Sequence, residues 1–147
     1  MVNRRQRRVA GKLLADFFAG EITNDEYDNE FPSASGDAAL KVVYWRIWFY
    51  YSDLHTHTLD HQDLSKDDIA LFKRCIDFLK TDLEYEGPPI RAGLPVARLF
   101  RRLLGGPRPQ SIFGSKSVED AVFFTDWWPF ASAEQIANAS QQTTDCS

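Results

Sequence analysis

One stretch of the chain, residues 38–54, is apolar or aromatic almost throughout, and it constrains the fold more than any other part of the sequence. Only Lys41, Arg46, Ser52 and Asp53 interrupt it. A helix that is apolar on nearly all sides is buried in the middle of a domain. The residue types also favour a strand, but a run of this length without Gly or Pro fits a helix better. We therefore predict a central helix from Ala38 to Leu54.

Helical patterns flank this run on both sides, and no internal repeat or second domain is visible. A chain of 147 residues has the size of one ordinary domain. The prediction is a mainly α fold: a single-domain bundle, residues 1–147, of five or six helices around the central aromatic-rich helix. Within it, residues 1–31 form an N-terminal helical hairpin and residues 140–147 a flexible tail. The expected helices are 3–18, 24–31, 38–54, 66–86, 95–104 and 133–139.

Several helix starts carry capping signals. Thr23 and Glu26 have the spacing of a capping box, in which each side chain hydrogen-bonds the backbone amide of the other residue. Ser65 precedes two acidic residues and an amphipathic stretch, so it is expected to cap the 66–86 helix. Ser35 is expected to cap the 38–54 helix, with Asp37 in its first turn. The apolar stripe expected along the 66–86 helix is Ile69, Phe72, Ile76, Leu79 and Leu83.

Charge is distributed unevenly along the chain, although the net charge is only -4. Residues 1–12 carry basic side chains and no acid, residues 16–37 carry acids and no base, and residues 87–118 again carry bases and no acid. Such blocks either neutralise one another within the fold or face a charged partner. The overall acidity disfavours a dedicated nucleic-acid-binding protein.

All three histidines fall within one short segment after the aromatic run: His55, His57 and His61. If the helix continues through it, His57 and His61 lie one turn apart on one face. They could then hold Zn²⁺, with Asp53 or Asp63 as a third ligand. Threonines weaken a helix here, so the alternative is a turn with surface histidines. No phosphate-binding loop, nucleophile elbow or zinc-protease motif is present, and the sequence assigns no catalytic residue.

Two further groups of residues are typical of protein interfaces, where aromatic side chains and arginine are enriched. The aromatic group is the segment 127–130 (Trp-Trp-Pro-Phe) near the C-terminus, which we call the aromatic clasp. The basic group lies on the expected 95–104 helix. Arginines there could also contact phosphates. The candidate interaction residues are Trp127, Trp128, Phe130, Arg98, Arg101 and Arg102.

The apolar segments and the cysteines of the chain indicate in which cellular compartment it is expected. No segment reaches the roughly 18 apolar residues that a membrane-spanning helix needs. With two cysteines, one inside an amphipathic helix and one next to the C-terminus, a disulfide framework is not indicated. A cytoplasmic protein is the simpler expectation.

The N-terminal hairpin shows one local resemblance. Leu13, Leu14 and Phe17, followed by Gly20 and the run 21–27 (Glu-Ile-Thr-Asn-Asp-Glu-Tyr), resemble the short helical hairpin of bacterial SHOCT-type modules. The resemblance covers about a fifth of the chain. It implies association through this hairpin, a bacterial origin and no catalytic residue.

These patterns together favour a non-catalytic protein-interaction domain of the bacterial cytoplasm that binds a protein partner or forms a homo-oligomer. One concrete form is an immunity- or antitoxin-like protein, which its size and acidity would suit. The alternative is a metal-binding protein or metal-dependent enzyme that uses the cluster His55–His61.

Overall fold

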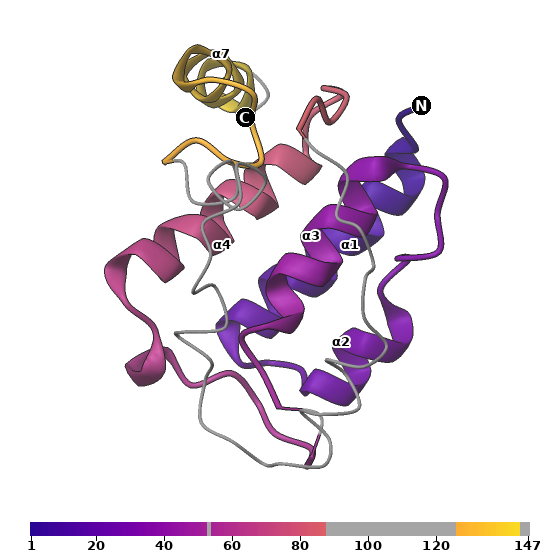
Figure 1. The fold of residues 1–147 in the computed structure, drawn as a ribbon, viewed down its shortest axis with the longest axis vertical. Coiled ribbons are helices and arrows are strands. Elements are labelled where there is room, and N and C mark those ends of the chain that lie inside the picture. The colour runs from indigo at the N-terminus through magenta and orange to yellow at the C-terminus, as the bar shows by residue number, and fades with distance from the viewer. Residues whose placement is uncertain (53, 88–125, 145–147) are drawn as a thin grey trace, which may run out of the picture.

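A computed structural model describes residues 1–52, 54–87 and 126–144 of the chain (Figure 1). Thr23 and Thr58 form one isolated antiparallel bridge, and no strand is present in these three ranges. The mainly α prediction is therefore confirmed. The expected 95–104 helix lies outside the described residues. The helices are α1 Arg4–Ala19, α2 Asn24–Glu30, α3 Ala38–Trp48, the 3-10 helix η1 His61–Asp63, α4 Lys66–Leu79 and α7 Ala133–Thr144.

The hairpin of α1 and α2 follows its local signals closely. Gly20 ends α1 with a φ of 75°, a left-handed conformation that glycine adopts without steric penalty. Thr23 and Glu26 form the expected capping box at the start of α2. Between the two helices, the rings of Phe17 and Tyr27 stack with centroids 4.9 Å apart. The hairpin is thus fixed both at its turn and across its interface.

The aromatic run forms a shorter helix than predicted. α3 begins at Ala38 but ends at Trp48, and residues 49–51 form a turn. The turn sends two successive tyrosines to different helices: Tyr50 donates a hydrogen bond to Asp68 of α4, and Tyr51 donates to Asp28 of α2. On a continuous helix, successive side chains are rotated by only about 100° around the helix axis, so the two tyrosines would point to neighbouring sides of it. These distant carboxylates, which local patterns do not reveal, favour the turn.

The start of α3 also differs from the prediction. The capping residue is Asp37 and not Ser35: the Asp37 carboxylate accepts from the Ala39 amide at 3.1 Å. Ser35 instead accepts from the Asp37 amide at 3.2 Å. Asp37 is the residue immediately before the helix, where a carboxylate reaches the free amides of the first turn.

Ser65 caps α4 as predicted, and the Asp68 side chain in addition accepts from the Ser65 amide, which completes a capping box. The helix ends at Leu79, however, several residues before Glu86. Beyond that point the carbonyl oxygens of Thr81 and Leu83 turn toward α1 and accept hydrogen bonds from Arg7, contacts that a regular helix through Glu86 would not offer in this form. The buried face of α4 is also rotated from the predicted stripe, since it consists of Leu71, Phe72, Cys75, Phe78 and Leu79.

The main core lies between α1, α3 and α4. The most extensive contact between two helices in the described part of the chain pairs α1 with α4, and α3 also packs against α4. In Figure 1, α3 runs in front of α1 and in roughly the same direction. Leu14, Phe17, Val43, Ile47 and Phe72 are fully buried in this core. Each such side chain contributes roughly 1.5–3 kcal/mol by burial. None of the described helices is long and apolar enough to cross a membrane.

The C-terminal helix packs on α4 through a second, smaller core. Phe78 of α4 meets Phe130 edge to face, with ring centroids 5.0 Å apart, and Ala39 and Ala139 complete the cluster. The Gln135 amide donates to Ser132, as expected for a cap at this position. α7 runs to Thr144 and not only to Ala139, so the first residues of the predicted flexible tail are helical. Residues 145–147 lie outside the described ranges.

Candidate functional site

The arginines at the start of α1 divide between the two faces of the helix. Arg7 is 1% exposed, whereas Arg4, Arg5 and Arg8 are exposed. Helix periodicity explains the division, because residue 7 lies on the same side as the buried Leu14 and the others turn away from it. One short sequence block therefore supplies both a core residue and a charged surface.

Arg7 is bound on all sides within the fold. Its guanidinium donates to both carboxylate oxygens of Asp37, at 2.7 and 3.0 Å, and to the carbonyls of Thr81 and Leu83. It also lies 5.4 Å from the centre of the Phe78 ring. This geometry is the bidentate pairing that makes arginine suitable for buried carboxylates. Arg7 thereby joins α1 to the start of α3 and to the chain after α4.

Asp37 is ionised in this setting. Burial alone raises the pKa of a carboxyl group. In Asp37, hydrogen bonds from Arg7 and from the amides of Asn3 and Ala39 outweigh the burial, and the pKa lies below its ordinary value. The pair is a structural element, because every hydrogen-bonding partner of Asp37 belongs to the described fold.

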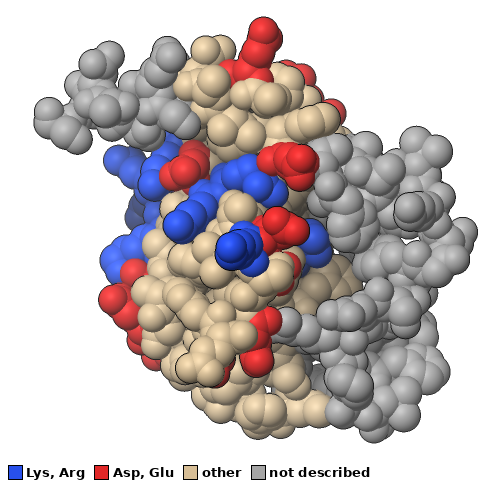
Figure 2. Space-filling model, turned by 90° about the vertical axis from the view of Figure 1, so that its left-hand side faces the viewer, with Lys and Arg blue, Asp and Glu red and all other residues tan. Residues whose placement is uncertain are grey.

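The basic side chains on the outer face of α1 make far fewer contacts within the fold than Arg7 does. Arg4 pairs with Asp82 and Lys12 with Asp16, and both bases are largely exposed. Arg5 and Arg8 have no ion pair or hydrogen bond from their side chains to any residue that the structure describes. Figure 2 shows one side of the molecule, on which basic and acidic side chains lie next to one another in its central and left-hand part.

Between these bases lies an apolar side chain. Val9 is 47% exposed, on the same side of α1 as Arg5 and Lys12. We call Arg5, Arg8, Val9 and Lys12 the outer stripe of α1. It combines unpaired positive charge with a small apolar surface, and nothing in the described fold covers it.

The histidine segment does not continue the helix that the metal hypothesis required. Buried Asn24 holds it in a non-helical conformation: its side-chain amide donates to the carbonyl of Ser52 at 2.9 Å, and its side-chain oxygen accepts from the amide of His57 at 2.8 Å. The Asn24 amide also donates to the carbonyl of His57. Asn24 therefore occupies the backbone groups that a helix over residues 53–61 would need.

The three imidazoles consequently divide into two groups. The rings of His55 and His57 lie 4.9 Å apart, whereas His61 stacks on Phe18 and donates from Nε2 to the Phe18 carbonyl. Among the described residues, no group of three or more potential metal ligands converges. Asp53, the third proposed ligand, lies outside them. A zinc site formed by Asp53, His57 and His61 stays a prediction.

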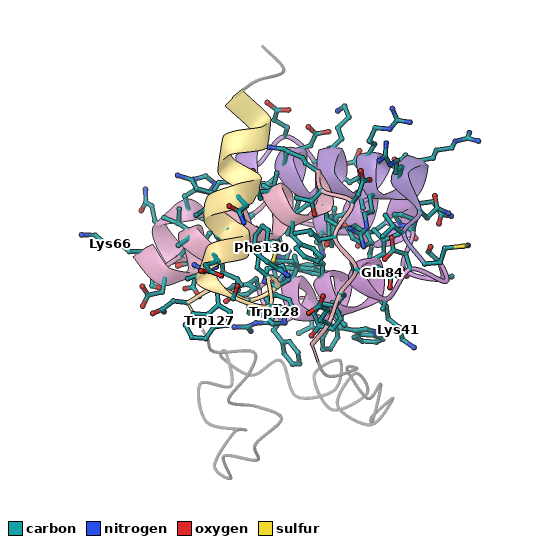
Figure 3. All side chains as sticks on the ribbon, turned by 90° about the horizontal axis from the view of Figure 1, so that it is seen from above. Lys41, Lys66, Glu84, Trp127, Trp128 and Phe130 are labelled. Carbon is teal, nitrogen blue, oxygen red and sulfur yellow. The ribbon has the colours of Figure 1, made fainter. Side chains whose placement is uncertain are left out.

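The aromatic clasp is divided between core and surface. Trp128 is 1% and Phe130 3% exposed, whereas Trp127 is 39% exposed. Figure 3 shows Trp128 and Phe130 beneath α7 and Trp127 at the edge of the molecule. Trp128 donates to the hydroxyl of Tyr85 at 3.1 Å. Of these three candidates Trp127 offers the largest accessible surface, while the candidates Arg98, Arg101 and Arg102 lie outside the described residues.

A cluster of tyrosines around Asp28 was not anticipated from the sequence. Tyr44 and Tyr51 both donate to one carboxylate oxygen of Asp28, the latter at 2.9 Å. Burial raises the pKa of Tyr51 and Tyr27 far above the ordinary value. These phenols therefore stay protonated. The hydrogen bonds from Tyr44 and Tyr51 to Asp28 join α2 to α3 and to the turn that follows α3. Because Tyr44 and Tyr51 lie in an aromatic run, their hydroxyls carried no separate sequence signal.

Comparison of the chain with protein-family models, curated proteins and solved structures finds no match in any of the three.

Proposed function

We propose that this chain is a non-catalytic protein-interaction domain and that it binds through the outer stripe of α1. The observation that carries the proposal is the pair of exposed arginines, Arg5 and Arg8, which have no partner among the described residues. The two carboxyl groups with lowered pKa values have structural roles: Asp37 is paired with Arg7, and Glu26, whose pKa is lowered by hydrogen bonds from Thr23, completes a helix cap.

Folding does not explain the positive charge of the outer stripe. The N-terminal end of a helix carries a partial positive charge, so basic side chains there are destabilising by about 0.3–1 kcal/mol each. The first turn of α1 contains no acid to offset them. Arg5 and Arg8 are also three residues apart, and Arg8 and Lys12 four, so that like charges adjoin along the helix. An anionic partner would relieve both effects.

The stripe suits a protein better than a membrane or a nucleic acid. An amphipathic helix that binds a membrane needs an exposed apolar face, whereas the apolar face of α1 is packed in the core and only Val9 is left on the outer stripe. A nucleic acid would meet a chain with a net charge of -4. A protein surface with carboxylates around a small apolar spot matches the stripe. Masking of a toxin, as by an immunity or antitoxin protein, and self-association are two forms of this function.

A photo-crosslinking amino acid in place of Val9 tests the proposal. With the full chain expressed in its native cell, irradiation should link it to one or a few proteins, and Arg5→Glu with Arg8→Glu should abolish the adducts. The matched control places the same amino acid at Ala137, an exposed position on α7. Adducts at Val9 that are no more abundant than at Ala137, or that survive the double charge reversal, would refute the proposal.

A further inference from the structure

Charge on the outer side of α1 changes sign along the helix. Arg5 and Arg8 occupy its N-terminal half, Lys12 and Asp16 form an ion pair near its middle, and the exposed Glu21 follows its C-terminal end. Arg5 and Asp16 are about 16 Å apart along the axis at 1.5 Å per residue. The surface therefore presents two arginines, unpaired among the described residues, at its N-terminal half, a neutralised pair further along, and the exposed carboxylate of Glu21 just beyond the helix.

This order of charges along α1 is complementary to the same order read in the opposite direction, as in a second, antiparallel copy of the helix. When two identical helices lie side by side and antiparallel, a twofold axis between residues 12 and 13 brings residue 8 of one opposite residue 17 of the other, and residue 5 opposite residue 20. Arg8 then lies beside Asp16 of the second copy, and Arg5 beside Glu21. The symmetry repeats both contacts, so that Arg5 and Arg8 of each copy, which have no partner among the described residues, lie near a carboxylate of the other copy. Asp16 is then shared between Lys12 of its own chain and Arg8 of the second copy.

The middle of the stripe is compatible with such a contact. Lys12 and Asp16 already neutralise each other within one chain, which limits the repulsion between the two lysines at the axis. Ala15 and Ala19 lie on the same outer side and are small enough to let two helices approach closely. Val9 of each copy would be covered by the other helix, which removes its apolar surface from water.

We propose that the partner of this surface is a second copy of the chain, and that α1 pairs antiparallel with α1 of that copy. This inference rests on the proposed function and names its partner. A uniformly acidic partner would be repelled by Asp16 and Glu21, whereas a partner with the reverse order of charges meets attraction along the whole stripe. Two copies of one chain satisfy this condition by symmetry alone.

Sedimentation equilibrium of the purified full chain with exchanged charges provides the test. Variant A carries Arg5→Glu and Arg8→Glu, and variant B carries Asp16→Arg and Glu21→Arg. Each variant alone sets like charges against each other in the pair and should be monomeric, with at least about tenfold weaker association than the wild type. An equimolar mixture of A and B restores opposite charges at both ends and should associate again.

The control variant carries Lys66→Glu and Lys73→Glu, which change the net charge as much as variant A but alter exposed positions on α4. It should associate like the wild type. Raising the salt concentration from about 50 to 500 mM should weaken wild-type association, because exposed ion pairs are screened. Circular dichroism of each variant verifies that the helices are retained.

Three results would overturn the inference: a wild-type chain that is monomeric at several hundred micromolar, a mixture of A and B that does not associate, or a control that is weakened as much as variant A. The proposed function fails separately. Crosslinks from position 9 to a foreign protein, with a monomeric purified chain, would refute self-pairing and support the broader proposal. Crosslinks to the chain itself support both.

Discussion

Arg7 and Arg8 are adjacent in the sequence, yet they have opposite relations to the fold. Arg7 is buried and makes four hydrogen bonds to Asp37, Thr81 and Leu83. Arg8 is exposed and bound to none of the described residues. A basic block in a sequence therefore combines residues that build the structure with residues left for contacts outside it. Which arginine does which depends on the helix face and on a carboxylate thirty residues away.

Replacement of Arg7 by Met should cause the largest change in stability, a decrease in the free energy of unfolding. It leaves the Asp37 carboxylate buried without its charged partner, and it frees two carbonyls after α4. Loss of one member of a buried ion pair typically lowers the free energy of unfolding by about 3–5 kcal/mol. Urea denaturation monitored by circular dichroism measures the change. Arg8→Met is the control and should stay within about 0.5 kcal/mol of the wild type; equal losses in the two variants would remove the distinction.

Acid should weaken the same buried pair, by less than the removal of Arg7. The pKa of Asp37 is lower in the folded chain than in the unfolded one, so the unfolded state binds more protons at acidic pH. The stabilisation is complete above the unfolded value of about 3.9 and is lost as pH falls through the lower folded pKa. The difference in unfolding free energy between wild type and Asp37→Asn should therefore shrink from pH 6 to pH 3.

Comparison with Asp37→Asn separates this effect from that of other carboxylates, such as Glu26, which titrate equally in both proteins. A difference that stays constant or grows as the pH falls would mean that Asp37 is not stabilised in its charged form.

Those parts of the fold that depend on neighbouring residues were predictable. The Thr23–Glu26 box and the cap at Ser65 are formed by side chains and amides within a few positions, and the structure contains both. The ends of α3 and α4 were predicted too late, because contacts distant in sequence decide them. Tyr51 reaches Asp28 of α2, and Arg7 takes the carbonyls of Thr81 and Leu83.

The candidate site shows the same limit. The basic block at the N-terminus was visible in the sequence, but the pairing of Arg7 with Asp37 was not, since Asp37 was expected only to favour a first helical turn. Helix periodicity places residue 7 on the side of the apolar residues of α1, but only the pairing with Asp37 explains how a charged guanidinium is accommodated there while Arg5 and Arg8 stay exposed. The conformation of the histidine segment likewise depends on Asn24, whose position in an expected helix start gave no indication of hydrogen bonds to residues 52–57.

The smallest expected effect is a gain in the free energy of unfolding, and it concerns the exposed arginine Arg5. Arg5 lies in the first turn of α1, where the helix dipole favours acids. Arg5→Glu should raise the free energy of unfolding by about 0.3–1 kcal/mol. Lys73→Glu, exposed in the middle of α4, is the control with the same charge change and lacks the benefit of the dipole. Chemical denaturation at low micromolar concentration keeps the chain dilute enough to isolate folding from association.

A destabilised Arg5→Glu variant would reveal an intramolecular role for Arg5 and would undermine the outer stripe as a binding surface. A stabilised variant would indicate that Arg5 is kept for function, because natural sequences commonly forgo such gains in stability where function requires an unfavourable residue. If the same substitution strengthens folding and removes crosslinks from position 9, the two measurements together separate the stability of α1 from its binding. Arg7→Met cannot achieve this separation, since its loss disturbs the fold itself.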